Sequence, residues 1–270
     1  MNKKALVALL IAICIPIASY LILKTAGSNA VVMPKKYLFD SVNQYIKDGK
    51  LESDTLWHIT KNIRLVNQLG DSVNLYDKPG KIMVIDFFFT HCRSICPALT
   101  RNMAQLQKSF LIGGNTRKKI DTSIVQFVSM SIDADRDSVT VLKKYADKFG
   151  VNHDNWWFLT GDKKAIAQFA FEELKVDKFS DAPVDSDFVH TNRFVLLDKN
   201  YVVRGYYNGL DKQANMQLAK DIGLLMLEKD AKKKGKIFRD IIDLSWLWFV
   251  IVLAISFFIY YLQSKREKNT

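Results

Sequence analysis

Cysteine is scarce in this sequence: only three of its 270 residues are cysteines, too few for a fold held together by disulfides. Internal repeats and low-complexity stretches are absent as well. Apolar residues make up 49% and charged residues 25%, proportions that exclude wholesale disorder and a collagen-like repeat. Charge itself is missing from two long segments, one near each end, and this absence excludes a freely soluble cytosolic domain.

The charge-free segments are residues 5–23 and residues 244–262, each 19 residues long. As helices they reach about 28 Å, enough to cross the hydrocarbon core of a membrane. The second segment has tryptophan near one end and tyrosine near the other, which suits headgroup depth and predicts a transmembrane helix. The first is either a transmembrane anchor or a signal peptide cleaved near Ala30. We favour the anchor, because the apolar stretch is long for a cleaved signal.

Basic residues set the expected orientation. Lysines precede the first segment and basic residues follow the second, which predicts cytoplasmic termini. Residues 25–243 would then lie on the non-cytoplasmic face of a bacterial-type inner membrane. The net charge is +11, but no basic stripe interleaved with aromatic residues is present, so no nucleic-acid partner is expected. The basic segment 228–240 fits membrane lipid headgroups instead.

The region between these segments predicts a linker and one domain. Residues 34–55 carry an apolar stripe of helical spacing that ends near Gly49, which predicts a helical linker. Residues 56–229 alternate apolar strands with amphipathic helices. The expected strands are a hairpin within 56–75 and segments 82–89, 123–132, 156–159, 193–197 and 201–206; the expected helices are 97–110, 138–149, 162–174 and 211–229. This order predicts an α/β fold, a thioredoxin-like three-layer sandwich with a mixed sheet.

Two cysteines, Cys92 and Cys96, directly follow the apolar strand 82–89. Sheets of this kind place their chemistry at the carboxyl ends of strands. If the loop winds into the next helix, the two thiols share one face, with Pro97 in the first turn. The helix N-terminus would then lower the pKa of both thiols. Such a pair can close a disulfide or bind a soft metal such as Cu(I) or Zn(II), and a purely structural disulfide outside the cytoplasm is the alternative.

Copper held by two thiolates needs a further donor, and the sequence has four histidines. His91 lies at a strand end and would point to the opposite side. His58 belongs to an early strand pattern, and His153 lies in a polar turn where we expect it to be solvated. His190 lies in the loop before the next-to-last strand, which in a thioredoxin-like sheet faces the cysteines. This position makes His190 the best candidate, although a loop histidine alone does not establish a metal site.

Several segments resemble the SCO/SenC family, the assembly factors of cytochrome c oxidase. They occur in the family's order and are FTHCRSICP at 89–97, SIDADRD at 131–137, FLTG at 158–161, and His190 followed by FVLLD at 194–198. The resemblance covers roughly Trp57 to Lys229.

This resemblance implies a membrane-tethered copper chaperone. Copper, as Cu(I) or Cu(II), would be bound by Cys92, Cys96 and His190 and delivered to the copper-site subunit of cytochrome c oxidase. Because the thiols must be reduced before they bind copper, a thiol reductase or another copper carrier is implied as a second partner.

Asp86 departs from the family pattern, which usually has an aromatic residue there. It lies six residues before Cys92, where a thioredoxin carries a buried proton-relay aspartate. A carboxylate in an apolar strand would have a raised pKa and could accept a thiol proton. This keeps open a second function, a thiol-disulfide oxidoreductase in which Cys92 and Cys96 are catalytic and Asp86 relays protons. In the opposing interpretation, Asp86 caps local backbone or faces a polar edge.

Other departures concern the surroundings of the site. The family commonly has an acidic residue where this chain has Val189, and a proline where it has Ala134. The second membrane segment is also unusual and leaves the partner geometry open. The acidic residues of 133–137 predict a strand-end turn in which Asp137 or Ser138 caps the next helix. A third hypothesis for the chain is a non-catalytic scaffold.

Overall fold

The computed structural model describes residues 32–110 except 48, residues 124–178 and residues 191–228. The chain divides into two compact units, residues 1–226 and 227–270, and the sheet and thiol site described below belong to the first. The predicted membrane segments 5–23 and 244–262 lie outside the described residues. Within the described ranges, no helix combines the length and the apolar character needed to cross a bilayer.

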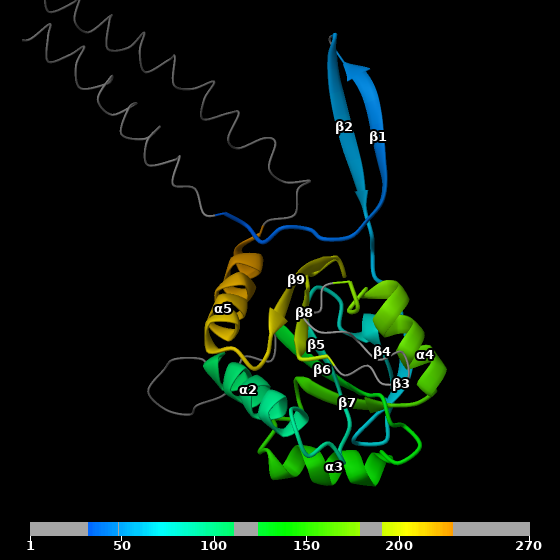
Figure 1. The fold of residues 1–270 in the computed structure, drawn as a ribbon, viewed down its shortest axis with the longest axis vertical. Coiled ribbons are helices and arrows are strands. Elements are labelled where there is room, and N and C mark those ends of the chain that lie inside the picture. Colours follow the sequence, from blue (N-terminus) through cyan, green and yellow to red (C-terminus); the bar gives the residue numbers. More distant parts are fainter. Residues whose placement is uncertain (1–31, 48, 111–123, 179–190, 229–270) are drawn as a thin grey trace, which may run out of the picture. The chain divides into compact units, whose positions relative to one another are not determined.

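A seven-stranded mixed sheet forms the middle layer (Figure 1). Its strand order is β4-β3-β7-β6-β5-β8-β9, in which β5, β6 and β7 run parallel and the remaining pairs are antiparallel. The strands are β3 (Arg64–Asn67), β4 (Ser72–Asn74), β5 (Ile82–Phe88), β6 (Val125–Ser131), β7 (Trp156–Thr160), β8 (Arg193–Leu197) and β9 (Val203–Asn208). The predicted strands and the predicted hairpin are confirmed.

Helices cover both faces of this sheet. Apolar side chains of α2 (Cys96–Ser109), α3 (Val139–Lys148) and α5 (Lys212–Leu227) pack on one face. The other face is covered by α4 (Lys163–Gln168), which continues as a one-turn π-helix, Phe169–Glu173. The four predicted helices are therefore present, and the three-layer α/β sandwich is confirmed.

The two central strands, β5 and β6, are covered by helices on both faces of the sheet. Every residue of β5 and β6 is buried, as expected for strands covered on both faces. Alternate side chains of β5 enter opposite layers: Ile82 and Val84 pack with α2, whereas Met83 and Ile85 pack with α4. The apolar run that precedes the cysteines thus forms one of the buried central strands of the domain.

The prediction of a helical linker over 34–55 is wrong. β1 (Phe39–Lys47) and β2 (Lys50–Trp57) pair with each other as a separate antiparallel hairpin (Figure 1). Between Lys47 and Lys50 stand two residues of sequence Asp-Gly, the composition that two-residue hairpin turns favour. Gly49 has a φ of +73°, a conformation that glycine adopts without a steric penalty.

Candidate metal and thiol site

The loop between β5 and α2 carries both cysteines. β5 ends at Phe88 and α2 begins at Cys96, so Cys92 lies between the end of the strand and the first turn of the helix. Pro97 occupies that first turn, where its missing N–H costs no helical hydrogen bond. The site therefore lies at the carboxyl edge of the parallel strands, as the sequence predicts.

Cys92 and Cys96 are free thiols that contact each other. The Cys96 N–H donates to Cys92 Sγ at 3.4 Å, and Ser94 Oγ lies 3.5 Å from the same sulfur. Both cysteines are buried, with exposed fractions of 6% for Cys92 and 2% for Cys96. The two thiols thus converge, as the spacing of four residues predicts, and Cys92 is the more accessible.

The two thiols differ in acidity. Burial raises the pKa of Cys92, but hydrogen bonds from the Ser94 hydroxyl, the Cys96 thiol and two backbone N–H groups outweigh it, and the pKa is lowered. Burial raises the pKa of Cys96 well above its ordinary value, and contact with the Cys92 sulfur raises it further. The prediction that the helix N-terminus lowers both pKa values is therefore wrong for Cys96, because burial dominates. Cys92 is the thiol that ionises first.

Asp86 lies in the same apolar layer as the two thiols. On β5, Asp86 lies two residues from Val84 and two from Phe88, so the three side chains point to the same face of the sheet. Val84 and Phe88 belong to the apolar cluster that contains Cys96. Its side chain is buried, and neither carboxyl oxygen has a hydrogen-bond partner among the described residues. Burial raises the pKa of Asp86 to about 7; the nearby Ser129 hydroxyl, whose own bonds go elsewhere, acts in the opposite direction. The interpretation that Asp86 caps local backbone or faces a polar edge is wrong.

A carboxylate that the sequence did not single out for this role fixes the cysteine loop. Asp137 is completely buried and accepts hydrogen bonds from the Thr90 N–H at 3.1 Å, from the Thr90 hydroxyl and from the Ser131 hydroxyl. It therefore does not cap α3, and Ser138, which occupies the N-cap position, makes no capping bond either. The only signal in the sequence is the position of Asp137, just after the end of β6. Through these hydrogen bonds, Asp137 connects the segment after the carboxyl end of β5 with the carboxyl end of β6.

The chain segment that follows His190 arrives at the same edge of the sheet as the thiols. β8 is antiparallel to β5, with Val84 opposite Leu196, so its first residue, Arg193, lies toward the carboxyl end of β5. Thr191 is buried, and its hydroxyl accepts from the Arg193 N–H at 3.1 Å. His190 itself lies outside the described residues, so its role as a ligand stays a prediction.

His58 and His91 are held by carboxylates or hydroxyls. The two ring nitrogens of His58 lie 2.7 Å from an oxygen of Asp40 and 3.1 Å from an oxygen of Glu173. His91 is exposed, with Nδ1 at 3.1 Å from the Thr90 hydroxyl. In the described ranges, no group of three histidine, cysteine or acidic side chains is arranged to hold a metal ion.

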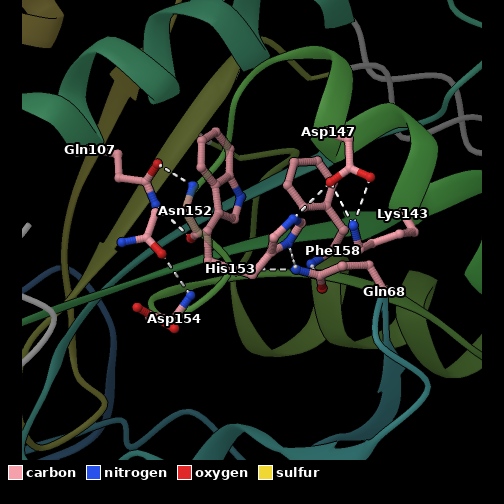
Figure 2. A network of polar contacts seen from close by, with 9 residues as sticks. Gln68, Gln107, Lys143, Asp147, Asn152, His153, Asp154 and Phe158 are labelled. Atoms are coloured by element: carbon pink, nitrogen blue, oxygen red, sulfur yellow. Dashed lines mark hydrogen bonds and ion pairs between the residues drawn. The ribbon is translucent and has the colours of Figure 1, made fainter.

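His153 belongs to a polar network at the amino-terminal end of β7 (Figure 2). Gln68 Nε2 lies 3.0 Å from His153 Nδ1, and Asp147 Oδ1 lies 2.9 Å from His153 Nε2. Lys143 pairs with the same carboxylate at 2.6 Å, and the amide of Gln68 also donates to the Trp156 carbonyl at 2.8 Å. The expectation that His153 is merely solvated is wrong. Because β7 runs parallel to the strand that ends at the cysteines, this network lies at the opposite edge of the sheet.

The arrangement of the thiols permits two kinds of chemistry. Two contacting sulfurs can lose two electrons and two protons to form a disulfide. The same sulfurs, once deprotonated, offer a pair of soft ligands that suits Cu(I) or Zn(II), with at least one further donor required. The donor chemistry of Cys92 and Cys96 thus fits a soft metal as cargo.

Comparisons with known proteins point in one direction. The sequence profile of the SCO1/SenC family matches residues 53–225. The SCO1 protein homolog of Bacillus subtilis (strain 168) is 30% identical over 176 residues, which are 64% of this chain and 86% of that protein.

Two solved structures share the fold. One is a SCO1/SenC family lipoprotein from Bacillus anthracis str. Ames, with 32% identity, a TM-score of 0.52 and coverage of 63% of this chain and 95% of that chain. The other is BsSco, with 30% identity, a TM-score of 0.52 and coverage of 65% and 98%, respectively.

Proposed function

Because this chain belongs to the SCO1/SenC family, we propose that it is a copper chaperone that helps to load the copper site of cytochrome c oxidase. Its structural relative BsSco is described as a member of the Sco family of cytochrome c oxidase assembly proteins. The observation that carries the proposal is the contacting pair of free thiols, Cys92 and Cys96, at the carboxyl edge of the sheet. Thiolates are the ligands that Cu(I) prefers.

Cys92, Cys96 and His190 would hold the copper. Two thiolates and an imidazole suit Cu(I), whereas Cu(II) would need a further ligand. The lowered pKa of Cys92 makes this sulfur the first thiolate available, and the buried Cys96 has to lose its proton on binding. Copper would leave by exchange of these ligands for thiols of the copper-site subunit. A thiol reductase or another copper carrier would keep Cys92 and Cys96 reduced before loading.

The membrane is part of the proposal. Residues 5–23 and 244–262 would tether the domain, with the thiols on the non-cytoplasmic face of a bacterial-type inner membrane. The support comes from the two charge-free segments and from a relative in Bacillus anthracis that is described as a lipoprotein.

Replacing His190 by alanine tests the chaperone. We expect the His190→Ala protein to lose most of its bound copper and the cells to lose oxidase activity, when copper stoichiometry and oxidase activity are measured separately. His153→Gln is the matched control, because His153 lies at the opposite edge of the sheet and its hydrogen bonds suit an amide. Full oxidase activity in a variant that no longer binds copper would refute the chaperone function.

A second function is favoured by the difference between the thiols and by Asp86. In a thiol-disulfide oxidoreductase, the Cys92 thiolate attacks a substrate disulfide and forms a mixed disulfide. The Cys96 sulfur then attacks Cys92, releases the substrate as a dithiol and leaves a Cys92–Cys96 disulfide, so two electrons pass to the substrate. Asp86 would accept the Cys96 proton. BsSco is described as containing a disulfide switch, which is consistent with redox chemistry in the family.

The two functions separate in the Asp86→Asn variant. The oxidoreductase predicts that this variant reduces a disulfide-bonded acceptor peptide more slowly, with the pH dependence of the rate changed, while copper stoichiometry stays the same. Unchanged reduction kinetics at every pH would remove Asp86 from the mechanism. A Cys96→Ser protein that still supports oxidase assembly would refute both functions and favour a scaffold.

A further inference from the structure

Both ends of the folded domain leave it at the edge of the sheet opposite the thiols. On the amino-terminal side, Arg204 donates to the Pro34 carbonyl at 2.7 and 3.1 Å. On the carboxyl-terminal side, Lys199 Nζ donates to the Met226 carbonyl at 3.3 Å. Lys199 and Arg204 belong to the β8–β9 hairpin near its turn, and β8 is antiparallel to β5. The routes toward residues 5–23 and 244–262 therefore start at the same edge, away from the cysteine loop.

The β1–β2 hairpin is rooted at this edge as well. The Tyr37 N–H donates to the Val203 carbonyl at 3.1 Å, and the Thr60 N–H donates to the Tyr201 carbonyl at 3.0 Å. At the root, Lys36 Nζ lies 5.4 Å from the ring centroid of Trp57. Beyond the root, β1 and β2 pair with no other strand in the part of the chain that the structure describes.

One face of the hairpin carries no charge: five of its eight residues are apolar, at the root and at the tip, and Gln44, Ser53 and Thr55 are polar. Paired residues of an antiparallel ladder share a face, and the pairs on this face are Phe39 with Trp57, Val42 with Thr55, Gln44 with Ser53, and Ile46 with Leu51. Near the tip, Ile46 is 78% exposed and Leu51 is 71% exposed. We call these eight residues the apolar hairpin face. The opposite face carries the acidic residues Glu52 and Asp54 together with Ser41, Asn43, Tyr45 and Leu56.

Resting on the membrane segments of the proposed function, we propose that the apolar hairpin face contacts the lipid bilayer, lying at the boundary between headgroups and acyl chains. Eight residues separate Leu23, the end of the first predicted membrane segment, from Val32, where the described chain begins, so this part of the domain lies within about 30 Å of the membrane. A strand of nine residues spans about 30 Å, so the hairpin can reach the bilayer.

The chemistry of the two hairpin faces fits this occupant. A bilayer surface accepts aliphatic and aromatic side chains and selects against charge, and the apolar hairpin face has aromatic residues at its root and aliphatic residues at its tip. The opposite face keeps Glu52 and Asp54 in water. The hairpin would then hold the domain against the membrane, with the thiols directed away from it.

Site-specific photocrosslinking in the full-length protein tests this contact. Benzoylphenylalanine is placed at Ile46 in one variant and at Tyr45 in the control, and both proteins are reconstituted into vesicles of phosphatidylcholine and phosphatidylglycerol. Tyr45 is adjacent in sequence but belongs to the opposite face, beside Glu52. After illumination, we expect a lipid adduct on the peptide that contains position 46, at least tenfold more abundant than at position 45.

The other results overturn the proposal. Equal lipid adducts at Ile46 and Tyr45, or none at either, would show that the hairpin does not rest on the bilayer, and a crosslinked dimer from position 46 would assign the face to a second copy. Failure of the protein to float with vesicles would remove both the predicted membrane segments and this contact. Copper binding by the two variants is measured in parallel and reports correct folding independently of lipid contact.

Discussion

The residues around the cysteine loop show how burial decides proton affinity. Asp86, Cys92 and Cys96 lie in one apolar layer, yet only Cys92 receives enough hydrogen bonds to its sulfur to lower its pKa. Cys96 and Asp86 are dominated by desolvation, which favours the protonated form of each. The site thus has one sulfur that ionises first, a second thiol that keeps its proton, and a carboxyl group, Asp86, that titrates near pH 7.

Replacing Asp86 by asparagine should stabilise the protein at alkaline pH. An ordinary aspartate has a pKa of 3.8, and folding raises that of Asp86 to about 7. The folded state therefore keeps a proton that the unfolded state has lost, so the stability of the native protein falls as pH rises from about 4 to about 7. The full difference corresponds to about 4 kcal/mol above pH 7.

We expect Asp86→Asn to unfold at a higher denaturant concentration than the native protein at pH 8, with a much smaller gain at pH 4. Urea unfolding of both proteins over this pH range measures the effect. Asp54→Asn is the control, because Asp54 is exposed on the hairpin. A stability difference that is independent of pH would show that Asp86 is not the titrating group.

Alkylation should distinguish the two cysteines. Iodoacetamide reacts with the thiolate, so Cys92, which has the lowered pKa and the greater exposure, should be modified at least tenfold faster than Cys96 at pH 7.5. Peptide mapping by mass spectrometry after short exposure gives both rates. Faster modification of Cys96 would contradict the assigned order of ionisation.

At the scale of secondary-structure elements, buried carboxylates connect segments that are distant in sequence. Asp137 links the exits of β5 and β6. Glu173, in the π-helix, accepts from the Lys61 backbone N–H at 3.1 Å and from Lys61 Nζ at 2.8 Å, and it lies 3.1 Å from His58 Nε2. These two residues hold the cysteine loop and the root of the hairpin, respectively.

Replacing Asp137 by alanine should loosen the cysteine loop. The change leaves the hydroxyls of Thr90 and Ser131 and one N–H without their acceptor in a buried site, which should cost about 3 kcal/mol. Chemical denaturation measures this cost, and the alkylation rate of Cys92 should rise because the loop opens more often. Asp135→Ala, at an exposed position of the same turn, should change neither value.

Replacing Glu173 by glutamine should release the hairpin root without unfolding the domain. Burial raises the pKa of Glu173, but hydrogen bonds from Lys61 and His58 outweigh burial and lower it, so the residue acts as a carboxylate. We expect hydrogen exchange in residues 37–61 to accelerate at least tenfold while β5 and β6 stay protected. The exposed neighbour Glu172 provides the control, Glu172→Gln. Equal acceleration throughout the sheet would indicate general destabilisation instead.

At the scale of the whole molecule, the domain has two distinct edges. The cysteine loop lies at the carboxyl edge of the parallel strands, whereas Pro34, Met226 and the hairpin root lie at the opposite edge. This separation would let the domain stay attached to a membrane while its thiols remain accessible to a partner.

The orientation in the cell can be measured through the thiols. If the predicted membrane segments are correct, a membrane-impermeant maleimide added to reduced spheroplasts should label Cys92 and Cys96 without permeabilisation. The double variant Cys92→Ser/Cys96→Ser controls for Cys14, which lies in the predicted first segment. Labelling that requires permeabilisation would place the thiols in the cytoplasm and contradict both the orientation and the proposed export of the site.

The sequence by itself determined the sandwich and the position of the cysteine pair, because long apolar strands and amphipathic helices have distinct periods and because the turn after β5 has to deliver the next residues to one edge. The tertiary structure alone decided the features that depend on distant neighbours. It showed that burial raises the pKa of Cys96, that Asp86 lies in an apolar layer without a hydrogen-bond partner among the described residues, and that Asp137 holds the cysteine loop. The hairpin at 39–57 differs from the predicted helix because its apolar spacing suits a helix as well as a strand; the Asp-Gly dipeptide before Lys50 is the signal in the sequence that favours a hairpin turn.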